Sequence, residues 1–334
     1  MNIFITGIAG FLGSNLADYY IEKGFKVGGC DNLVGGDLDN VDSNVNFYQG
    51  DCEDLDFMTN ATKHNVDVLC HSAAYAHEGL SNISPTLICQ NNMTGSVATF
   101  TAAIRNKVKR IVFCSSMARY GNIETPFKET DKCYPADPYG VTKLAAENIL
   151  KILCETHGLE YNIAVPHNII GPKQKYDDPF RNVASIMTNL ILMDKQPVIY
   201  GDGEQKRCFS YIDDCLDCLI PMLDQKNLNK QVINIGPDEE FVTINKVSEI
   251  CSNITGNNLK PIHKKDRPRE VKHASCSADK ARDLLGYKTT TTLYDGIQKT
   301  FNYIKKRGPK PFDYHINLEI ENELTPKSWL KKEI

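Results

Sequence analysis

The residues TGIAGFLGSNL, positions 6–16, decide the fold class because they join a short apolar run to a segment with helical spacing. The run NIFIT (2–6) precedes them, and the helix-like segment SNLADYYIEKG follows from Ser14. Gly7, Gly10 and Gly13 would let the backbone turn tightly and approach a pyrophosphate at the positive start of a helix. The sequence therefore predicts a dinucleotide-binding turn. The alternative is three ordinary turn glycines.

Apolar runs of strand length recur along the chain, with helix-like segments between them. The expected strands are NIFIT (2–6), KVGGCD (26–31), VNFYQG (45–50), VDVLCHSAA (66–74), RIVFCSS (110–116), YNIAVPHNIIG (161–171) and QVINIG (231–236). Alternation of strands and helices is typical of a parallel sheet covered on both faces. We therefore predict an α/β fold, a Rossmann-type doubly wound parallel sheet.

A change in character follows Pro172, where polar and proline-rich turns such as GPKQKYDDPF and KKDRPREVK appear. We expect a smaller, interleaved C-terminal substrate domain there. The predicted dinucleotide domain takes residues 1–171 and about 208–236, and the substrate domain takes about 172–207 and 237–334. The tail from Gly308 is expected to be extended and packed on the surface.

Composition excludes some classes of partner. A net charge of −4 gives no general attraction to nucleic acid or to an anionic membrane surface. No apolar stretch reaches the roughly 18 residues of a membrane span. Twelve cysteines and the absence of a signal-like start favour the cytoplasm. Cys215 and Cys218 form a CxxC pair that we expect on one helix rather than in a metal site, so no metal is predicted.

Two carboxylates follow expected strands and bear on the choice of dinucleotide. Asp31 ends the second strand, where a carboxylate would bind both ribose hydroxyls of the adenosine and repel a 2′-phosphate. NAD is therefore favoured over NADP. Asp51, in GDCED, could accept a hydrogen bond from the adenine amino group. Its alternative role is that of a helix cap.

The stretch DPYGVTKLAAENIL contains a candidate base. Asp137 is expected to cap a helix and Pro138 to occupy its first turn. Tyr139 and Lys143, four residues apart, then share one face. A free phenol has a pKa of about 10 and is a poor base at neutral pH. A nearby ammonium and the positive charge of bound NAD⁺ would both lower that pKa.

Taken in order, several pieces resemble the extended short-chain dehydrogenase/reductase family, and specifically its NAD-dependent nucleotide-sugar epimerases. The pieces span nearly the whole chain and include TGIAGFLG, CDNL, GDCED, HSAA, FCSSMARYG, DPYGVTK, PHNIIGP, YGDGEQKRCFSYIDD and RPREVKHASCSADKARDLLGY. The cofactor contacts that this resemblance implies are Gly7, Gly10, Phe11, Leu12, Gly13, Asp31, Asn32, Asp51, Cys52, Ala73, Ala74, Asn92, Ser115, Tyr139, Lys143 and Pro166.

The resemblance implies a catalytic set of Ser116, Tyr139 and Lys143. Tyr139 would take the proton of the sugar C4 hydroxyl while the hydride passes to the nicotinamide, and the 4-keto sugar would turn and take it back. Ser116 would position the reacting hydroxyl, and Lys143 would hold the nicotinamide ribose. Ser115 is expected to bond the backbone. Met117 and Ala118 stand where related dehydratases and decarboxylases carry acidic groups, which argues against dehydration.

The substrate contacts that the resemblance implies are Ser116, Met117, Tyr139, Asn168, Asn182, Arg207, Arg267 and Glu270. An arginine at position 207 would bind the diphosphate, and Glu270 the nucleotide ribose. The family usually has Gly-Asp where this chain has Arg269-Glu270. Arg119 and Arg181 are expected to face solvent, with an acidic sugar such as a uronate as the alternative partner.

The leading prediction is a 4-epimerase of the UDP-glucose/UDP-galactose kind that binds a nucleotide-diphosphate sugar, with a UDP-sugar as the first choice. A 4,6-dehydratase, decarboxylase or reductase is the alternative within the enzyme class. A non-catalytic NAD-sensing protein is the alternative outside it, and such proteins tend to lack the Tyr/Lys pair. A homodimer through helices like 92–107 and 139–157 is also expected.

Overall fold

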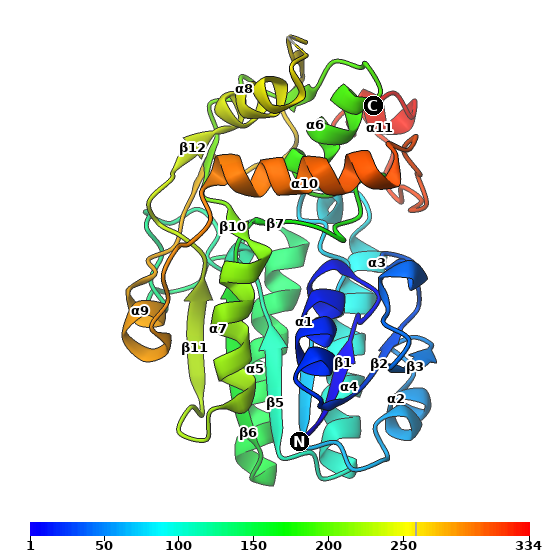
Figure 1. The fold of residues 1–334 in the computed structure, drawn as a ribbon, viewed down its shortest axis with the longest axis vertical. Coiled ribbons are helices and arrows are strands. Elements are labelled where there is room, and N and C mark those ends of the chain that lie inside the picture. Colours follow the sequence, from blue (N-terminus) through cyan, green and yellow to red (C-terminus); the bar gives the residue numbers. More distant parts are fainter. Residues whose placement is uncertain (258) are drawn as a thin grey trace.

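The computed structural model describes residues 1–257 and 259–334. Its centre is a seven-stranded parallel sheet in the order β11-β6-β5-β4-β1-β2-β3 (Figure 1). The strands are β1 (Asn2–Thr6), β2 (Lys26–Asp31), β3 (Asn46–Gln49), β4 (Val68–His71), β5 (Arg110–Cys114), β6 (Glu160–Pro166) and β11 (Gln231–Ile235). The predicted doubly wound α/β fold is confirmed.

Strand order reverses beside β1, which sets the position of the site. β1 pairs with β2 on one side and with β4 on the other, so the chain winds outward in both directions from this point. In open parallel sheets, ligands bind at the carboxyl ends of the strands where the order reverses. The turn at Gly7 and the segment after His71 meet there: a Cβ added to Gly7 would lie 2.9 Å from the Cα of Ala73.

Helices cover both faces of the sheet (Figure 1). In chain order, the helices of the sheet and of the smaller unit beyond it are α1 (Phe11–Glu22), α2 (Leu55–Ala61), α3 (Pro85–Cys89), α4 (Gly95–Arg105), α5 (Pro138–His157), α6 (Val183–Leu192), α7 (Ile212–Asp224), α8 (Ile244–Thr255), α9 (Asp279–Leu285), α10 (Leu293–Arg307) and α11 (Lys327–Leu330). Ile3 and Ile5 of β1 pack toward α1 and α7, whereas Phe4 packs toward α4 and α5. This alternation follows from the two-residue period of a strand.

One expected strand is split in the structure. YNIAVPHNIIG was predicted as one strand, but β6 ends at Pro166 and a separate strand β7 (Ile169–Ile170) pairs with β10 (Ser210–Tyr211). Asn168 between them has a φ of +42°. Asparagine tolerates this left-handed conformation better than most residues, so the chain turns out of the sheet here. The prediction of one continuous strand is therefore wrong.

A smaller unit lies beyond the carboxyl edge of the sheet, where α6, α8 and α10 pack together (Figure 1). Its core includes Met187, Ile191, Val247 and Ile297. Its short strands are β8 (Val198–Tyr200), β9 (Lys206–Arg207), β12 (Val242–Thr243), β13 (Ile262–Lys264) and β14 (His273–Ala274). The exact domain boundaries stay a prediction.

The tail from Gly308 is more deeply packed than predicted. It is largely irregular up to Pro326 and ends in the short helix α11. Ile316 and Trp329 are buried in a cluster with Leu80 and Phe180. This packing is favourable because it removes apolar side chains from water. Most of the tail lies on the surface, as predicted, and Ile316 and Trp329 anchor it in this buried cluster.

Cys215 and Cys218 both lie in α7 with buried side chains, as the helix interpretation predicts. Within residues 1–257 and 259–334, none of the helices has the length and apolar character needed to span a membrane.

Candidate active site

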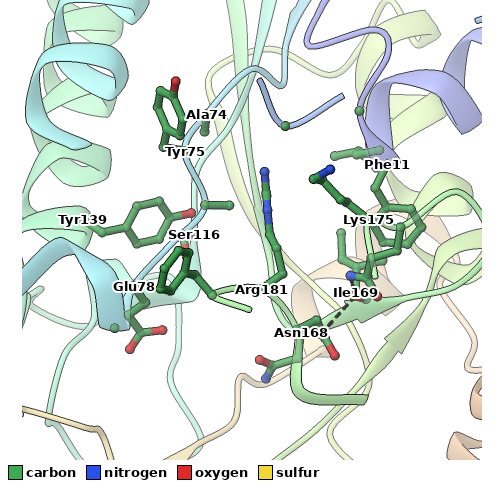
Figure 2. A pocket seen from close by; sticks show the side chains of 18 of the residues that line it. Phe11, Ala74, Tyr75, Glu78, Ser116, Tyr139, Asn168, Ile169, Lys175 and Arg181 are labelled. Atoms are coloured by element: carbon green, nitrogen blue, oxygen red, sulfur yellow. Dashed lines mark hydrogen bonds between the residues drawn. The ribbon is translucent and has the colours of Figure 1, made fainter. Parts of the chain in front are cut away.

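A cavity of about 450 Å³ lies between the carboxyl edge of the sheet and the smaller unit. Figure 2 shows side chains from both units pointing into it. The predicted residues that line it are Gly7, Gly10, Phe11, Leu12, Gly13, Asp31, Asn32, Asp51, Cys52, Ala73, Ala74, Ser115, Ser116, Tyr139, Lys143, Pro166, Asn168, Asn182, Arg207, Arg267 and Glu270. The fold thus brings together residues predicted from distant motifs.

Two predicted contacts lie outside the cavity lining. Asn92 is buried, and its side chain accepts from the N–H of Tyr75 at 2.9 Å and donates to the carbonyl of Tyr75 at 3.1 Å. It supports the cavity wall through the Tyr75 backbone. Met117 is buried in the core that contains Phe113 and Tyr120. The ligand contacts predicted for Asn92 and Met117 stay predictions.

The first turn fits a dinucleotide pyrophosphate. Gly7 has a φ of +69°, and its amide and that of Ile8 both donate to the carbonyl of Cys30. α1 then begins at Phe11 after the N-cap residue Gly10, with no described side chain capping it and no acidic residue in its first turn. The first residues of this helix line the cavity, and the positive start of a helix is favourable for an anion.

The Asp31 carboxylate is oriented by the backbone. It accepts from the N–H of Ala9 at 3.0 Å and from that of Leu33 at 2.8 Å. Burial raises the pKa of Asp31, and these two hydrogen bonds oppose the rise. A side chain at Gly36 would meet the carboxylate, since a Cβ there would lie 2.9 Å from Oδ1. The Asp31 carboxylate is held in place by the backbone, and Gly36 leaves space beside it. Both features fit the adenosine ribose of NAD.

Asp51 lines the same cavity and accepts from the side-chain amide of Asn32 at 3.0 Å. It was considered as a helix cap, but the structure assigns that role to Asp54, which accepts from the N–H groups of Asp56 and Phe57 at the start of α2. The cap alternative for Asp51 is therefore wrong, and its adenine contact stays a prediction.

Tyr139 is placed by the start of α5 as predicted. Asp137 is the N-cap and accepts from the N–H of Gly140 at 2.8 Å, and Pro138 occupies the first helical position. Ser116 follows β5, and its hydroxyl accepts from the N–H of Ala118 at 3.2 Å. Figure 2 shows the Tyr139 hydroxyl pointing toward Ser116. The two hydroxyls thus lie together in the cavity.

Lys143 was expected to lower the pKa of Tyr139, but the protein's own groups together raise it. Burial raises the pKa of Tyr139 above its ordinary value; a hydrogen bond with Ser116 lowers it, whereas the charges of Glu78 and Asp137 raise it further. Lys143 donates to the carbonyl of Cys114 at 2.9 Å, and burial lowers its own pKa to about 8. Of the two positive charges in the prediction, the charge of bound NAD⁺ is the one left that would favour the phenolate form of Tyr139.

The hydroxyl of Ser115 donates to the carboxylate of Glu147, and its N–H donates to the carbonyl of Ala164 at 2.8 Å. Arg119 is buried, with Nη2 3.3 Å from the same Glu147 carboxylate. This arginine was expected to face solvent, which is wrong because it forms an internal ion pair. It lies outside the cavity lining, so it does not face a sugar either.

The nucleotide-sugar end carries a compact ion-pair network. Arg267 donates twice to Glu270, at 2.7 and 2.8 Å, and Nη2 of Arg207 lies 3.8 Å from the same carboxylate. Burial alone would raise the pKa of Glu270, but the two arginines outweigh it and the pKa is lowered. Asn168 donates to the carbonyl of Cys208 at 2.9 Å, and Asn182 caps α6. The substrate roles of these residues stay predictions.

Sequence reasoning missed Glu78 and misplaced Arg181, both of which line the cavity. Glu78 is enclosed by protein, but its carboxylate is accessible from the cavity itself and points into it (Figure 2). Burial raises its pKa, with the charge of Arg207 opposing that rise. Arg181 was expected in solvent, but its side chain crosses the cavity. Glu78 lies in the segment AAYAHEGLS (73–81), which is distinctive within the family pattern and is the sequence signal that could have pointed to it.

Comparison with known proteins shows the family to which the chain belongs. The NAD dependent epimerase/dehydratase family matches residues 3–236. The UDP-glucose 4-epimerase of Halalkalibacterium halodurans is 30% identical over 326 residues, covering 92% of this chain and 96% of the relative. The structure of UDP-glucose 4-epimerase from Thermotoga maritima with UDP-glucose has a TM-score of 0.87 at 30% identity, covering 92% of this chain and 99% of that chain.

A further similar structure is UDP-glucuronic acid 4-epimerase from Bacillus cereus in complex with UDP-glucuronic acid and NAD. It has a TM-score of 0.85 at 28% identity and covers 92% of this chain and all of its own. The cofactor is NAD. The family and the similar structure indicate this, and the glycine turn and the fixed Asp31 carboxylate fit it. The chain belongs to the NAD-dependent epimerase/dehydratase family, within the short-chain dehydrogenase/reductase type of nucleotide-sugar epimerases.

Proposed function

We propose that this protein inverts C4 of a UDP-sugar of the UDP-glucose/UDP-galactose type, by way of a transient 4-keto sugar. The observation that carries the proposal is the Tyr139 hydroxyl beside Ser116 in a cavity that also contains the dinucleotide turn. Neither Met117 nor Ala118, which follow Ser116, can exchange a proton. Tyr139 is thus the base in this arrangement, and the two residues after Ser116 supply no acidic side chain.

The chain's own residues would act on the sugar as follows. Ser116 binds the reacting hydroxyl and aligns it with Tyr139, which takes the proton as general base and later returns it. Bound NAD would supply the hydride acceptor. Lys143, fixed at the end of β5, would hold the nicotinamide ribose. Arg207 and Arg267 would hold the diphosphate.

Dehydration is a second candidate, and Glu78 is the observation that favours it. Its carboxylate enters the same cavity from the segment after β4, and its charge acts on Tyr139. Among the described residues, this carboxylate has no hydrogen-bond partner or ion pair. A carboxyl group there could assist loss of water even though positions 117 and 118 carry no acid.

The test is incubation of the protein with UDP-, GDP- and CDP-sugars without added NAD. Interconversion of C4 epimers at constant mass would support the proposal. Loss of one water from the sugar would support the dehydratase instead. No change in any sugar, from protein shown to contain NAD, would contradict both and favour a non-catalytic role.

We also propose a homodimer through α4 and α5. Val141 and Ile152 of α5 are apolar, yet their exposed fractions are 53% and 63%. A partner copy that covered this helix would remove both side chains from water.

The cysteines are free thiols and most are buried, which suits a reducing compartment. We therefore propose that the protein is located in the cytoplasm.

A further inference from the structure

Arg181 places a positive charge in the middle of the cavity, and none of the roles above uses it. It lies just before α6, in the smaller unit, and its side chain extends across the cavity (Figure 2), where Nη2 comes close to Gly35. An arginine normally keeps its guanidinium in water or pairs it with an acid. In the described part of the chain, Arg181 is paired with an acid only through Nε, so the charged end of its side chain inside the cavity is available to a ligand.

The guanidinium is held at one end only. Its Nε donates to Oδ2 of Asp178 at 3.2 Å, and Asp178 also accepts from the N–H of Phe180 at 2.9 Å. His77, from the segment after β4, lies 3.0 Å from the same carboxylate oxygen. Both side chains of the His77–Asp178 pair are fully buried. Asp178 is thus a rigid anchor that aims the arginine.

The other end of the guanidinium faces the dinucleotide side. Within the part of the chain that the structure describes, Nη1 and Nη2 of Arg181 have no hydrogen-bond partner. Nη2 approaches Gly35, in the loop after β2, so closely that a Cβ there would lie only 2.5 Å away. Gly35 therefore leaves the space through which the arginine reaches the cofactor half of the cavity.

Electrostatics agree with this placement. Burial raises the pKa values of Asp31, Tyr75 and Tyr139, and the charge of Arg181 opposes the rise in all three. All three residues line the cavity, and Asp31 among them is the group that fits the adenosine ribose. Arg207 and Arg267 lie instead at the nucleotide-sugar end, where they share Glu270. The cavity thus has separate positive groups for two anionic ligands.

We propose that Arg181 binds the pyrophosphate of the dinucleotide, so that a residue of the smaller unit closes over the cofactor and retains it. Its planar fork with two unpaired terminal nitrogens suits two phosphate oxygens. The start of α1 would bind the same anion. The inference rests on NAD as the cofactor and is independent of which sugar reacts. Retention suits an enzyme whose cofactor is restored in every cycle.

Binding measurements on the full chain test this inference without turnover. After removal of bound NAD, the dissociation constants of NAD, ADP, adenosine and UDP would be compared for wild type and Arg181→Gln. Because hydrogen bonds to charged groups contribute about 1.5–3 kcal/mol, we expect NAD and ADP to bind roughly tenfold to a hundredfold more weakly. Adenosine, which lacks phosphate, and UDP should change less than about twofold.

Two further variants make the result specific. Arg105→Gln removes one exposed positive charge outside the cavity and should leave all four constants unchanged. Arg181→Lys keeps the charge without the fork and should recover part of the NAD affinity. NAD binding within twofold of wild type in Arg181→Gln would overturn the inference. A loss of UDP affinity in place of NAD affinity would assign Arg181 to the nucleotide sugar instead.

Discussion

The ammonium nitrogen of Lys143 lies 2.9 Å from the carbonyl oxygen of Cys114 and 5.9 Å from the ring centroid of Tyr139. The two residues share one face of α5, but the lysine is attached to the end of β5 and not to the phenol oxygen. Both residues line the cavity. The proton chemistry of the phenol depends more directly on Ser116, Glu78 and the bound cofactor.

Tyr139→Phe should abolish turnover while NAD stays bound. The change removes the general base, which contributes about 10²- to 10⁴-fold to rate, but it removes no anion-binding group. Epimer interconversion and NAD released on denaturation would be measured together. Tyr120→Phe is the matched control, because its hydroxyl donates to Asn234 at 2.8 Å in the core. It should cost about 1 kcal/mol of stability and little activity. Undiminished interconversion by Tyr139→Phe would exclude it as the base.

Glu78→Gln should shift the rising limb of the pH–rate profile to lower pH. After burial, the charge of Glu78 is one of the groups that raise the pKa of Tyr139. Removing that negative charge lowers the pKa, so the phenolate forms at a lower pH. The profile of kcat against pH checks the direction, and the exposed Glu323→Gln serves as control. A shift toward higher pH would contradict the electrostatic role given to Glu78.

Asp31→Asn should reduce discrimination against NADP. The variant keeps the shape of the side chain but removes the negative charge that would repel a 2′-phosphate. We expect the ratio of NADP to NAD affinity to rise by about tenfold, as a lost close charge repulsion would give. Titration with both dinucleotides measures the ratio. Asp42→Asn, on an exposed turn, should leave it unchanged. Equal ratios in Asp31→Asn and wild type would mean that Asp31 does not set the preference.

Trp329→Ala should lower the free energy of unfolding and loosen one cavity wall. Trp329 is 2% exposed, and its ring lies 5.0 Å from that of Phe180 and 6.1 Å from that of Tyr200. Both partners line the cavity. Loss of so large a buried side chain costs about 3–5 kcal/mol. Urea unfolding and the KM for the sugar would be measured, with exposed Leu324→Ala as control. A full-length variant as stable as wild type would show that the tail does not brace this wall.

Ile152→Glu should convert the proposed dimer to a monomer. A charge at this exposed apolar position would have to be buried in the interface, which is unfavourable without a partner. Light scattering coupled to gel filtration gives the mass in solution. Leu284→Glu makes the same change at an exposed position on α9 and should leave the dimer intact. A wild-type protein that is monomeric at all concentrations measured would contradict the proposed dimer.

Local rules explain why much of the site could be predicted. The glycine turn after β1, the Asp31 carboxylate at the end of β2 and the Asp137–Pro138 start of α5 each depend on a few neighbouring residues. In a parallel sheet, the carboxyl ends of the strands share one edge. Residues predicted separately from each strand end therefore meet in one cavity.

The order of elements, the dinucleotide turn and the Tyr139 helix followed from the sequence alone, because periodicity, capping and turn chemistry act over short separations. Only the tertiary structure revealed the turn at Asn168, the packed tail and the charges of Glu78 and Arg181 inside the cavity. The His77–Asp178 pair that anchors Arg181 joins positions 101 residues apart. Contacts at such separations depend on how whole elements pack, and no local pattern in one sequence encodes them.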